Sequence, residues 1–180
     1  SMKRASIIIA AAAAFASCST QAPEPFGPLP SPSQVEWQKM ETNMFMHFGP
    51  NTFTNVEWGN GKESVDAFNP TEMDCRQWAS VAKEAGFKGI IITAKHHDGF
   101  CLWPSKDNVG YSMSAVPAPN TGRDIVREMS DACRREGLGF GVYLSPWDRH
   151  QASYAKPEYV DYFFEQWDDL MSNYGELCEI

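Results

Sequence analysis

Two adjacent histidines follow a short, strongly apolar run of the chain. Residues 89–100 read GIIITAKHHDGF, so that His96 and His97 come soon after four apolar or β-branched residues. Such a run is typical of a strand that is buried on both faces in a parallel sheet. Parallel α/β folds bind ligands at the C-terminal ends of their strands. Two imidazoles between Lys95 and Asp98 therefore favour a binding site over a simple strand cap.

Metal-dependent hydrolysis is one chemistry to consider for these histidines. Barrel metallohydrolases place two ligands on one strand with a single residue between them, because alternate residues share a face. His96 and His97 are adjacent, and both can reach one pocket only if the chain leaves strand geometry there, which Gly99 permits. No acidic residue and histidine stand at the spacing of a ligand set. We therefore expect no metal and no cofactor, and a metal-dependent barrel hydrolase is kept only as an alternative.

Hydrolysis of a glycoside fits these residues better. Histidines donate hydrogen bonds to sugar hydroxyls, and the chain is rich in aromatic residues (13%), whose rings pack on the apolar faces of sugars or fill a core. The reaction also needs two carboxylates beside the scissile bond. Glu57, Asp98 and Asp148 are candidates, and none stands out. Asp98 could instead orient the histidines or hold the Gly99 turn, and Asp148 could serve in the pocket or only pair with Arg149.

Strand-like and helix-like segments alternate along the chain. The predicted strands lie near 44–48, 89–95, 139–145 and 176–180, and the predicted helices near 74–85, 124–136 and 158–174. Residues able to do chemistry follow the strands and never precede them. A site built from successive strand ends is typical of a (β/α)8 barrel, which needs eight strands and about 250 residues. We therefore predict an α/β fold with parallel strands and outer helices, the N-terminal half of a TIM-like (β/α)8 barrel.

Local signals predict the helix ends. Asp74 with a glutamine three residues later marks the first helix, and Thr121 with Asp124 three residues later marks the second. Pro157 and Gly175 bound the third helix. Its apolar residues recur at a spacing of three and four, which predicts one buried face: Val160, Phe163, Phe164, Trp167, Leu170, Met171 and Tyr174.

Four cysteines lie in the body of the chain without the spacing of a metal site. They are Cys75, Cys101, Cys133 and Cys178. We interpret them as small buried hydrophobic residues. A disulfide outside the cytosol stays open, because a sequence cannot pair its cysteines.

The N-terminus has the pattern of an export signal. Lys3 and Arg4 precede an apolar run, and Phe15–Cys18 resembles a bacterial lipoprotein box. We predict a signal peptide over 1–18, a Pro/Ser-rich tether over 19–36 and a catalytic-domain segment over 37–180. The expected location is the periplasm or cell surface of a bacterium, with a membrane contact only through a lipid on Cys18. The net charge of −8 argues against nucleic acid as a partner.

Several motifs together resemble the α-L-fucosidases of glycoside hydrolase family 29. The resemblance runs from about Trp37 to Ile180, and the motifs that carry it are Met46–Gly49, Glu57–Gly59, Ala94–Phe100, Gly122–Ile125 and Gly141–Ser145. Members of this family are retaining exo-enzymes with a barrel catalytic domain and a C-terminal β-domain. The resemblance implies a fucosylated oligosaccharide or glycoconjugate as the partner.

The resemblance also implies roles for individual residues. By this likeness His47, His96 and His97 bind fucose hydroxyls, Tyr143 lies close to the reacting centre, and Trp58 touches the sugar ring. The segment 145–149, SPWDR, resembles that of the subgroup that favours α-1,3/1,4 linkages.

The residues that cleave the bond are not among those that match. The family's nucleophile is an aspartate expected just after Ile180, and its acid/base residue follows later. No catalytic residue is therefore assigned within 1–180, and this portion alone is expected to be inactive. Two alternatives stay open, a non-catalytic fucose-binding fragment and a half-barrel that needs a partner chain.

Overall fold

The computed structural model describes residues 22–180, so the predicted signal peptide and Cys18 lie outside the described residues. The chain divides into two units, residues 1–35 and 36–180. Residues 22–31 form no helix or strand, and helix α2 (Pro32–Met40) then begins inside the segment predicted as a tether. Ser31 and Gln34 explain this start, because each side chain bonds the other's backbone N–H in a capping box. Within residues 22–180, no helix has the length and hydrophobicity needed to cross a membrane.

The second unit is built on a three-stranded parallel sheet. Its strands are β1 (Asn43–Met46), β2 (Gly89–Lys95) and β3 (Gly139–Leu144), in the order β1-β2-β3. Asn43 pairs with Gly89, and Gly89 pairs with Gly139, so the three strands begin in register. The prediction of parallel strands is confirmed for these three, and their C-terminal ends lie at one edge of the sheet.

The predicted strand over 176–180 is wrong in its extent. This segment makes one isolated parallel bridge, between Gly141 and Glu179. Two backbone hydrogen bonds support the bridge, from Cys178 N to Phe140 O at 2.8 Å and from Val142 N to Glu179 O at 3.1 Å. The residues of this segment are exposed or only half-buried, so the segment lacks the two-sided burial that a central strand requires.

The three predicted helices are present with nearly the expected bounds. They are α4 (Cys75–Glu84), α5 (Ile125–Glu136) and α6 (Glu158–Asn173). Asp74 caps α4 by accepting from two backbone N–H groups, as predicted. The cap of α5 is Asp124, which accepts from Arg127 N at 2.8 Å, whereas Thr121 donates its hydroxyl to Val116 O. Thr121 therefore belongs to the loop.

Short helical turns occupy the loops that join β1 to α4 and β2 to α5. Helix α3 (Pro50–Thr54) follows β1, and two 3-10 turns, η1 (Val65–Ala67) and η2 (Val109–Tyr111), lie in the loops after β1 and β2. The loop after β1 carries Trp58, whose ring lies beside His97 at the end of β2.

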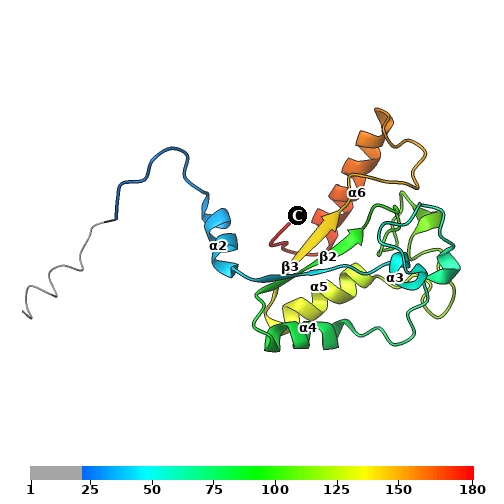
Figure 1. The fold of residues 1–180 in the computed structure, drawn as a ribbon, viewed down its shortest axis with the longest axis horizontal. Helices are drawn as coiled ribbons and strands as arrows, with labels where there is room; N and C mark the ends of the chain where they lie inside the picture. The colour runs from blue at the N-terminus through cyan, green and yellow to red at the C-terminus, as the bar shows by residue number, and fades with distance from the viewer. Residues whose placement is uncertain (1–21) are drawn as a thin grey trace, which may run out of the picture. The chain divides into compact units, whose positions relative to one another are not determined.

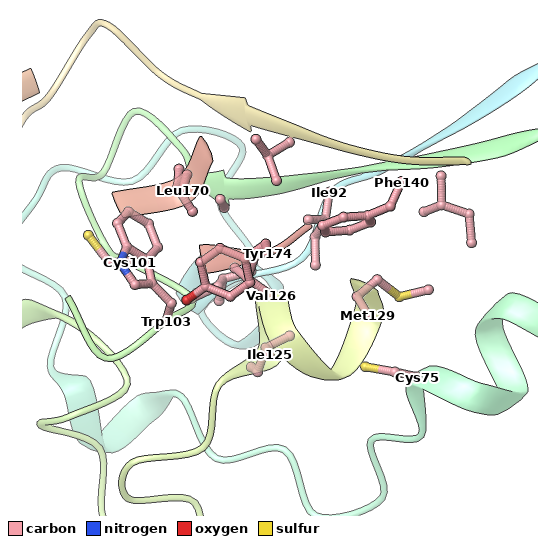
Figure 2. Packing of buried hydrophobic residues seen from close by; sticks show 14 of the residues in the cluster. Cys75, Ile92, Cys101, Trp103, Ile125, Val126, Met129, Phe140, Leu170 and Tyr174 are labelled. Carbon is pink, nitrogen blue, oxygen red and sulfur yellow. The ribbon is translucent and has the colours of Figure 1, made fainter. Parts of the chain in front are cut away.

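The hydrophobic core lies between the sheet and the helices. Figure 1 shows α4 and α5 side by side along one face of the sheet. Figure 2 shows Ile92 and Phe140 pointing from their strands towards Val126 and Met129 of α5. All four side chains are at most 5% exposed. Burial of side chains of this size contributes about 1.5–3 kcal/mol each, so this layer holds the strands that position the site.

Helix α6 buries a different set of residues from the predicted apolar face. Val160, Phe164 and Met171 are 51%, 64% and 50% exposed, whereas Leu170 is fully buried. The polar Gln166 is also fully buried, because its amide binds groups beneath the strand ends. The apolar face predicted for α6 is therefore buried only in part.

The cysteines are free thiols in the part of the chain that the structure describes. Cys75, Cys101 and Cys133 are buried, as predicted, and Cys178 is half-buried. Burial raises the pKa of each of the first three thiols to about 12, so they stay protonated and act as small apolar groups.

Candidate binding site

The two histidines after β2 lie on the same side of the chain. The pairing of β2 with β3 shifts register between Thr93 and Lys95, and the strand ends at Lys95. The rings of His96 and His97 then lie with centroids 4.0 Å apart and planes tilted by 30°. The condition set by the sequence analysis is therefore met, because the chain leaves strand geometry at His96.

Gly99 closes this turn in a way that no other residue could. Its φ is +88°, and a Cβ at this position would overlap the carboxylate of Asp148. A side chain here would therefore meet both backbone strain and a steric clash. The glycine allows the loop after β3 to pack directly against the exit of β2.

The other two strand ends bring further predicted residues to the histidine pair. His47 follows β1 directly, and its ring centroid lies 4.2 Å from that of His96. Tyr143 lies near the end of β3, with its ring 6.3 Å from His96. The Tyr143 ring also contacts the exposed Phe45 of β1, with ring centroids 5.7 Å apart. Three consecutive strands thus contribute to one group of rings, as predicted.

Trp58 completes this group from the loop after β1. Its indole stands edge-on to His97, with centroids 5.8 Å apart and planes at 86°, and it is 46% exposed. The structure therefore brings together all five residues predicted to bind the ligand, His47, Trp58, His96, His97 and Tyr143, which we call the ring cluster.

Trp147 was not among the predicted site residues, although it lies in the segment 145–149 that resembles a subgroup of the family. Its ring lies 5.0 Å from His97 and 5.6 Å from Trp58. Arg149 stacks its guanidinium on the Trp147 ring, 4.8 Å from the ring centroid. The same guanidinium donates a hydrogen bond to the Gly59 carbonyl. The loop after β3 thereby fixes the loop that carries Trp58.

The imidazoles of the ring cluster are uncharged near neutral pH. Burial, together with the neighbouring His47 and His97, lowers the pKa of His96 to about 4. Burial also lowers the pKa of His47. The pKa of His97 is lowered by burial first, and then by His47 and Arg149. A neutral imidazole offers one donor and one acceptor, which suits hydroxyl groups better than anions.

Two of the three candidate carboxylates, those of Asp98 and Asp148, are used by the protein itself. Asp98 is buried and accepts from Phe100 N at 2.6 Å and from Asn51 Nδ2 at 2.9 Å, so it holds the turn, one of the roles foreseen. Burial raises the pKa of Asp98 to about 6. The foreseen pairing of Asp148 with Arg149 is wrong, because Asp148 pairs with Lys95 instead. Glu57 is exposed.

A buried ion pair begins one residue before the ring cluster, at Lys95. Lys95 Nζ donates to Asp148 Oδ2 at 3.0 Å, to Gln166 Oε1 at 2.8 Å and to Tyr159 Oη at 3.3 Å. The side chains of Lys95 and Asp148 have no exposed surface. Asp148 also accepts from the backbone N–H groups of residues 150 and 151. We call Lys95, Asp148, Tyr159 and Gln166 the buried network. It connects β2, the loop after β3 and α6.

Two cavities flank the ring cluster. One, of about 340 Å³, lies beside His47 and Trp78 and has mostly apolar walls. The other, of about 370 Å³, lies beside Trp58 and Arg149. No group of three or more His, Cys, Asp or Glu side chains in residues 22–180 is arranged to hold a metal ion. The ring cluster therefore offers neutral imidazoles that can form hydrogen bonds, with a cavity on each of two sides.

Comparison with known proteins places this geometry in a family. The family model described as alpha-L-fucosidase matches residues 26–179. The chain is 48% identical over 159 residues to alpha-L-fucosidase 1 of Arabidopsis thaliana, covering 88% of this chain and 31% of the plant protein. It is 32% identical over 114 residues to the human plasma alpha-L-fucosidase, covering 61% of this chain and 22% of the human protein.

Solved structures give the same result. A glycoside hydrolase 29 family member from an unknown rumen bacterium superimposes with a TM-score of 0.82 at 54% identity, covering 86% of this chain and 28% of that one. A Ruminococcus gnavus GH29 fucosidase in complex with fucose superimposes with a TM-score of 0.76 at 34% identity, covering 86% and 34%. The chain thus spans about a third of the length of these relatives.

Proposed function

The chain belongs to the α-L-fucosidase family of glycoside hydrolases, family 29, and on this premise we propose that it is the fucose-binding part of an exo-acting, retaining α-L-fucosidase. The convergence of three neutral histidines, a tyrosine and a tryptophan at the strand ends carries this proposal. The proposed substrates are fucosylated oligosaccharides or glycoconjugates with terminal α-linked L-fucose, including α-1,3/1,4 linkages.

In this proposal the residues have separate roles. His47, His96 and His97 exchange hydrogen bonds with fucose hydroxyls, because neutral imidazoles can both donate and accept. Trp58 packs its exposed indole against the sugar ring. Tyr143 lies next to the reacting carbon. The proposed fold of the whole enzyme is a (β/α)8 barrel, of which β1, β2 and β3 are consecutive strands.

Cleavage requires a carboxylate pair that the ring cluster does not provide. Retaining hydrolysis proceeds through a covalent intermediate on one carboxylate, with a second acting as acid and base. Asp98 and Asp148 are engaged in holding the fold. We therefore expect the 180-residue chain to bind L-fucose without hydrolysing fucosides, and a longer product of the same reading frame to hydrolyse them.

The test is to measure both properties. Calorimetric titration of the 180-residue chain with L-fucose should give binding, and titration with D-fucose, its mirror image, should not. The longer product should release fucose from 4-nitrophenyl α-L-fucoside, and NMR should detect the α-anomer first. Hydrolysis by the short chain at the rate of the long one, or loss of activity with EDTA, would contradict the proposal.

We also propose that residues 1–18 direct export to the periplasm or cell surface of a bacterium, with lipid attached at Cys18. The support is the sequence pattern of Lys3 and Arg4 followed by an apolar run and a cysteine. Cell fractionation of the native chain and of Cys18→Ala tests it. Unchanged processing and membrane association in Cys18→Ala would rule out the lipid.

A further inference from the structure

Ser145 is a buried serine between the ring cluster and the loop after β3. It follows β3 directly and has no exposed surface. Its Oγ makes two short contacts, to His97 Nδ1 at 2.7 Å and to the carbonyl oxygen of Trp147 at 2.7 Å. Ser145 was named in the sequence analysis only as part of a motif.

These two contacts determine which atoms carry protons. A carbonyl oxygen can only accept, and a hydroxyl has one proton to give, so the Ser145 proton lies on the contact to Trp147. The contact to His97 then needs a proton from the imidazole, with Nδ1 as the donor. The opposite tautomer would place two acceptors 2.7 Å apart with no proton between them.

The assignment leaves the other imidazole nitrogen with a free lone pair. His97 Nε2 makes no hydrogen bond to any residue in the part of the chain that the structure describes, and the ring is half-buried. Because the pKa of His97 is lowered, this nitrogen stays unprotonated near neutral pH. It is therefore an acceptor.

His96 provides a contrast within the same cluster. Its Nδ1 is buried and finds no partner among residues 22–180. No neighbouring group therefore selects a tautomer for His96, whereas Ser145 selects one for His97.

We infer that Ser145 is a positioning residue that fixes His97 as the Nδ1–H tautomer, so that His97 Nε2 accepts a hydrogen bond from one hydroxyl of the bound sugar. The assignment of the tautomer stands on the geometry alone, and only the identity of the ligand rests on the proposed function. The consequence for specificity is that the ligand must supply an O–H at this position. A group that can only accept, such as fluorine, is rejected there.

The first experiment records the tautomer directly. Long-range ¹H–¹⁵N NMR of the 180-residue chain with labelled histidines, near neutral pH, should show His97 protonated at Nδ1 only. Ser145→Ala should show a mixture of both tautomers, and Ser145→Thr, which keeps the hydroxyl, should restore the single form. Protonation at Nε2 in the native chain, or no change in Ser145→Ala, would overturn the inference.

Ser112→Ala is the matched control. Ser112 has no exposed surface and donates its hydroxyl to the Val109 carbonyl, away from His97. The Ser112→Ala variant loses a buried serine hydroxyl that does not contact the His97 imidazole, so His97 should keep its native spectrum. If Ser145→Ala does not fold, the spectrum of the native chain still decides the tautomer.

The second experiment measures what the tautomer does for binding. Methyl α-L-fucoside is compared with analogues that each carry fluorine in place of one ring hydroxyl. One analogue should bind the native chain roughly 3- to 10-fold more weakly, as expected for one lost hydrogen bond, and this penalty should shrink in Ser145→Ala. An equal penalty in both proteins would contradict the proposed role. Absence of any fucose binding would instead refute the proposed function and leave the NMR result standing.

Discussion

Lys95 and His96 are neighbours in the chain, yet they belong to two opposite kinds of polar group. The buried network around Lys95 has both charges withdrawn from solvent and paired, with Lys95 Nζ bonded to three oxygens. The ring cluster around His96 is uncharged and half-buried, and His96 Nδ1 has no partner in residues 22–180. Lys95, whose ammonium group is fully hydrogen-bonded within the protein, is thus followed directly by His96, whose imidazole can still form hydrogen bonds with a ligand.

The largest effect is expected from removing one charge of the buried network. Lys95→Met leaves the Asp148 carboxylate buried without its cation, and breaking such a pair costs about 3–5 kcal/mol. Chemical denaturation should therefore show a large loss in the free energy of unfolding. Removing both charges in Lys95→Met/Asp148→Leu should recover part of this loss, because no uncompensated charge remains.

An exposed ion pair supplies the control for this prediction. Arg134 and Asp131 of α5 lie 2.7 Å apart with side chains 59% and 44% exposed. Asp131→Asn should change the free energy of unfolding by at most about 1 kcal/mol. Equal losses in Lys95→Met and Asp131→Asn would show that the buried network does not hold the fold.

The second effect concerns the ring cluster and should appear in binding, with little change in stability. His97→Ala removes the acceptor proposed for a sugar hydroxyl, and an unpaired buried group costs about 1–3 kcal/mol, or roughly 5- to 150-fold in affinity. Calorimetric titration with L-fucose measures it, and denaturation of the same variant shows whether the fold is retained. An unchanged affinity would remove His97 from the site.

A smaller effect is expected at Trp58, because its contribution is a ring contact. Trp58→Ala should weaken fucose binding by about 0.5–1.5 kcal/mol. Trp37 has the same exposed fraction, 46%, but donates to Glu179 and contacts none of the ring cluster. Trp37→Ala should therefore leave the affinity unchanged, and similar losses in both variants would show a nonspecific effect.

The last effect is a pH dependence of stability, which solvent partly screens. The pKa of His96 is about 4 in the folded chain, against an ordinary value of 6.5. Between these values the unfolded chain binds the proton and the folded chain does not, so stability falls as the pH falls. The difference in unfolding free energy between the native chain and His96→Gln should therefore rise from about pH 4 to 6.5 and be flat outside this range. A slope of opposite sign would contradict the lowered pKa.

The features predicted correctly from sequence are local ones. The run of isoleucines before His96 gave β2, and Asp74 with the residues after it gave the start of α4. Such features depend on neighbouring residues in the chain. The ring cluster is not local: its residues came from the family resemblance, and their convergence was expected because the ends of parallel strands meet at one edge.

The features that were missed depend on partners far away in the sequence. Asp148 was given two possible roles, in the pocket or paired with the adjacent Arg149, but its cation is Lys95, 53 residues earlier. Gln166 interrupts the apolar face of α6 because the same lysine needs an acceptor there. No local pattern contains these pairings.

The order of the strands in the sheet is also the order in which they are synthesised. β2 pairs with β1, and β3 pairs with β2, so each strand docks on the one made just before it. A nascent chain can therefore extend the sheet one strand at a time from its N-terminus, without waiting for a partner that emerges later. Ribosome-bound chains arrested once α5 has emerged should already protect Ile92 from proteolysis, and cleavage there would show that β2 waits for β3.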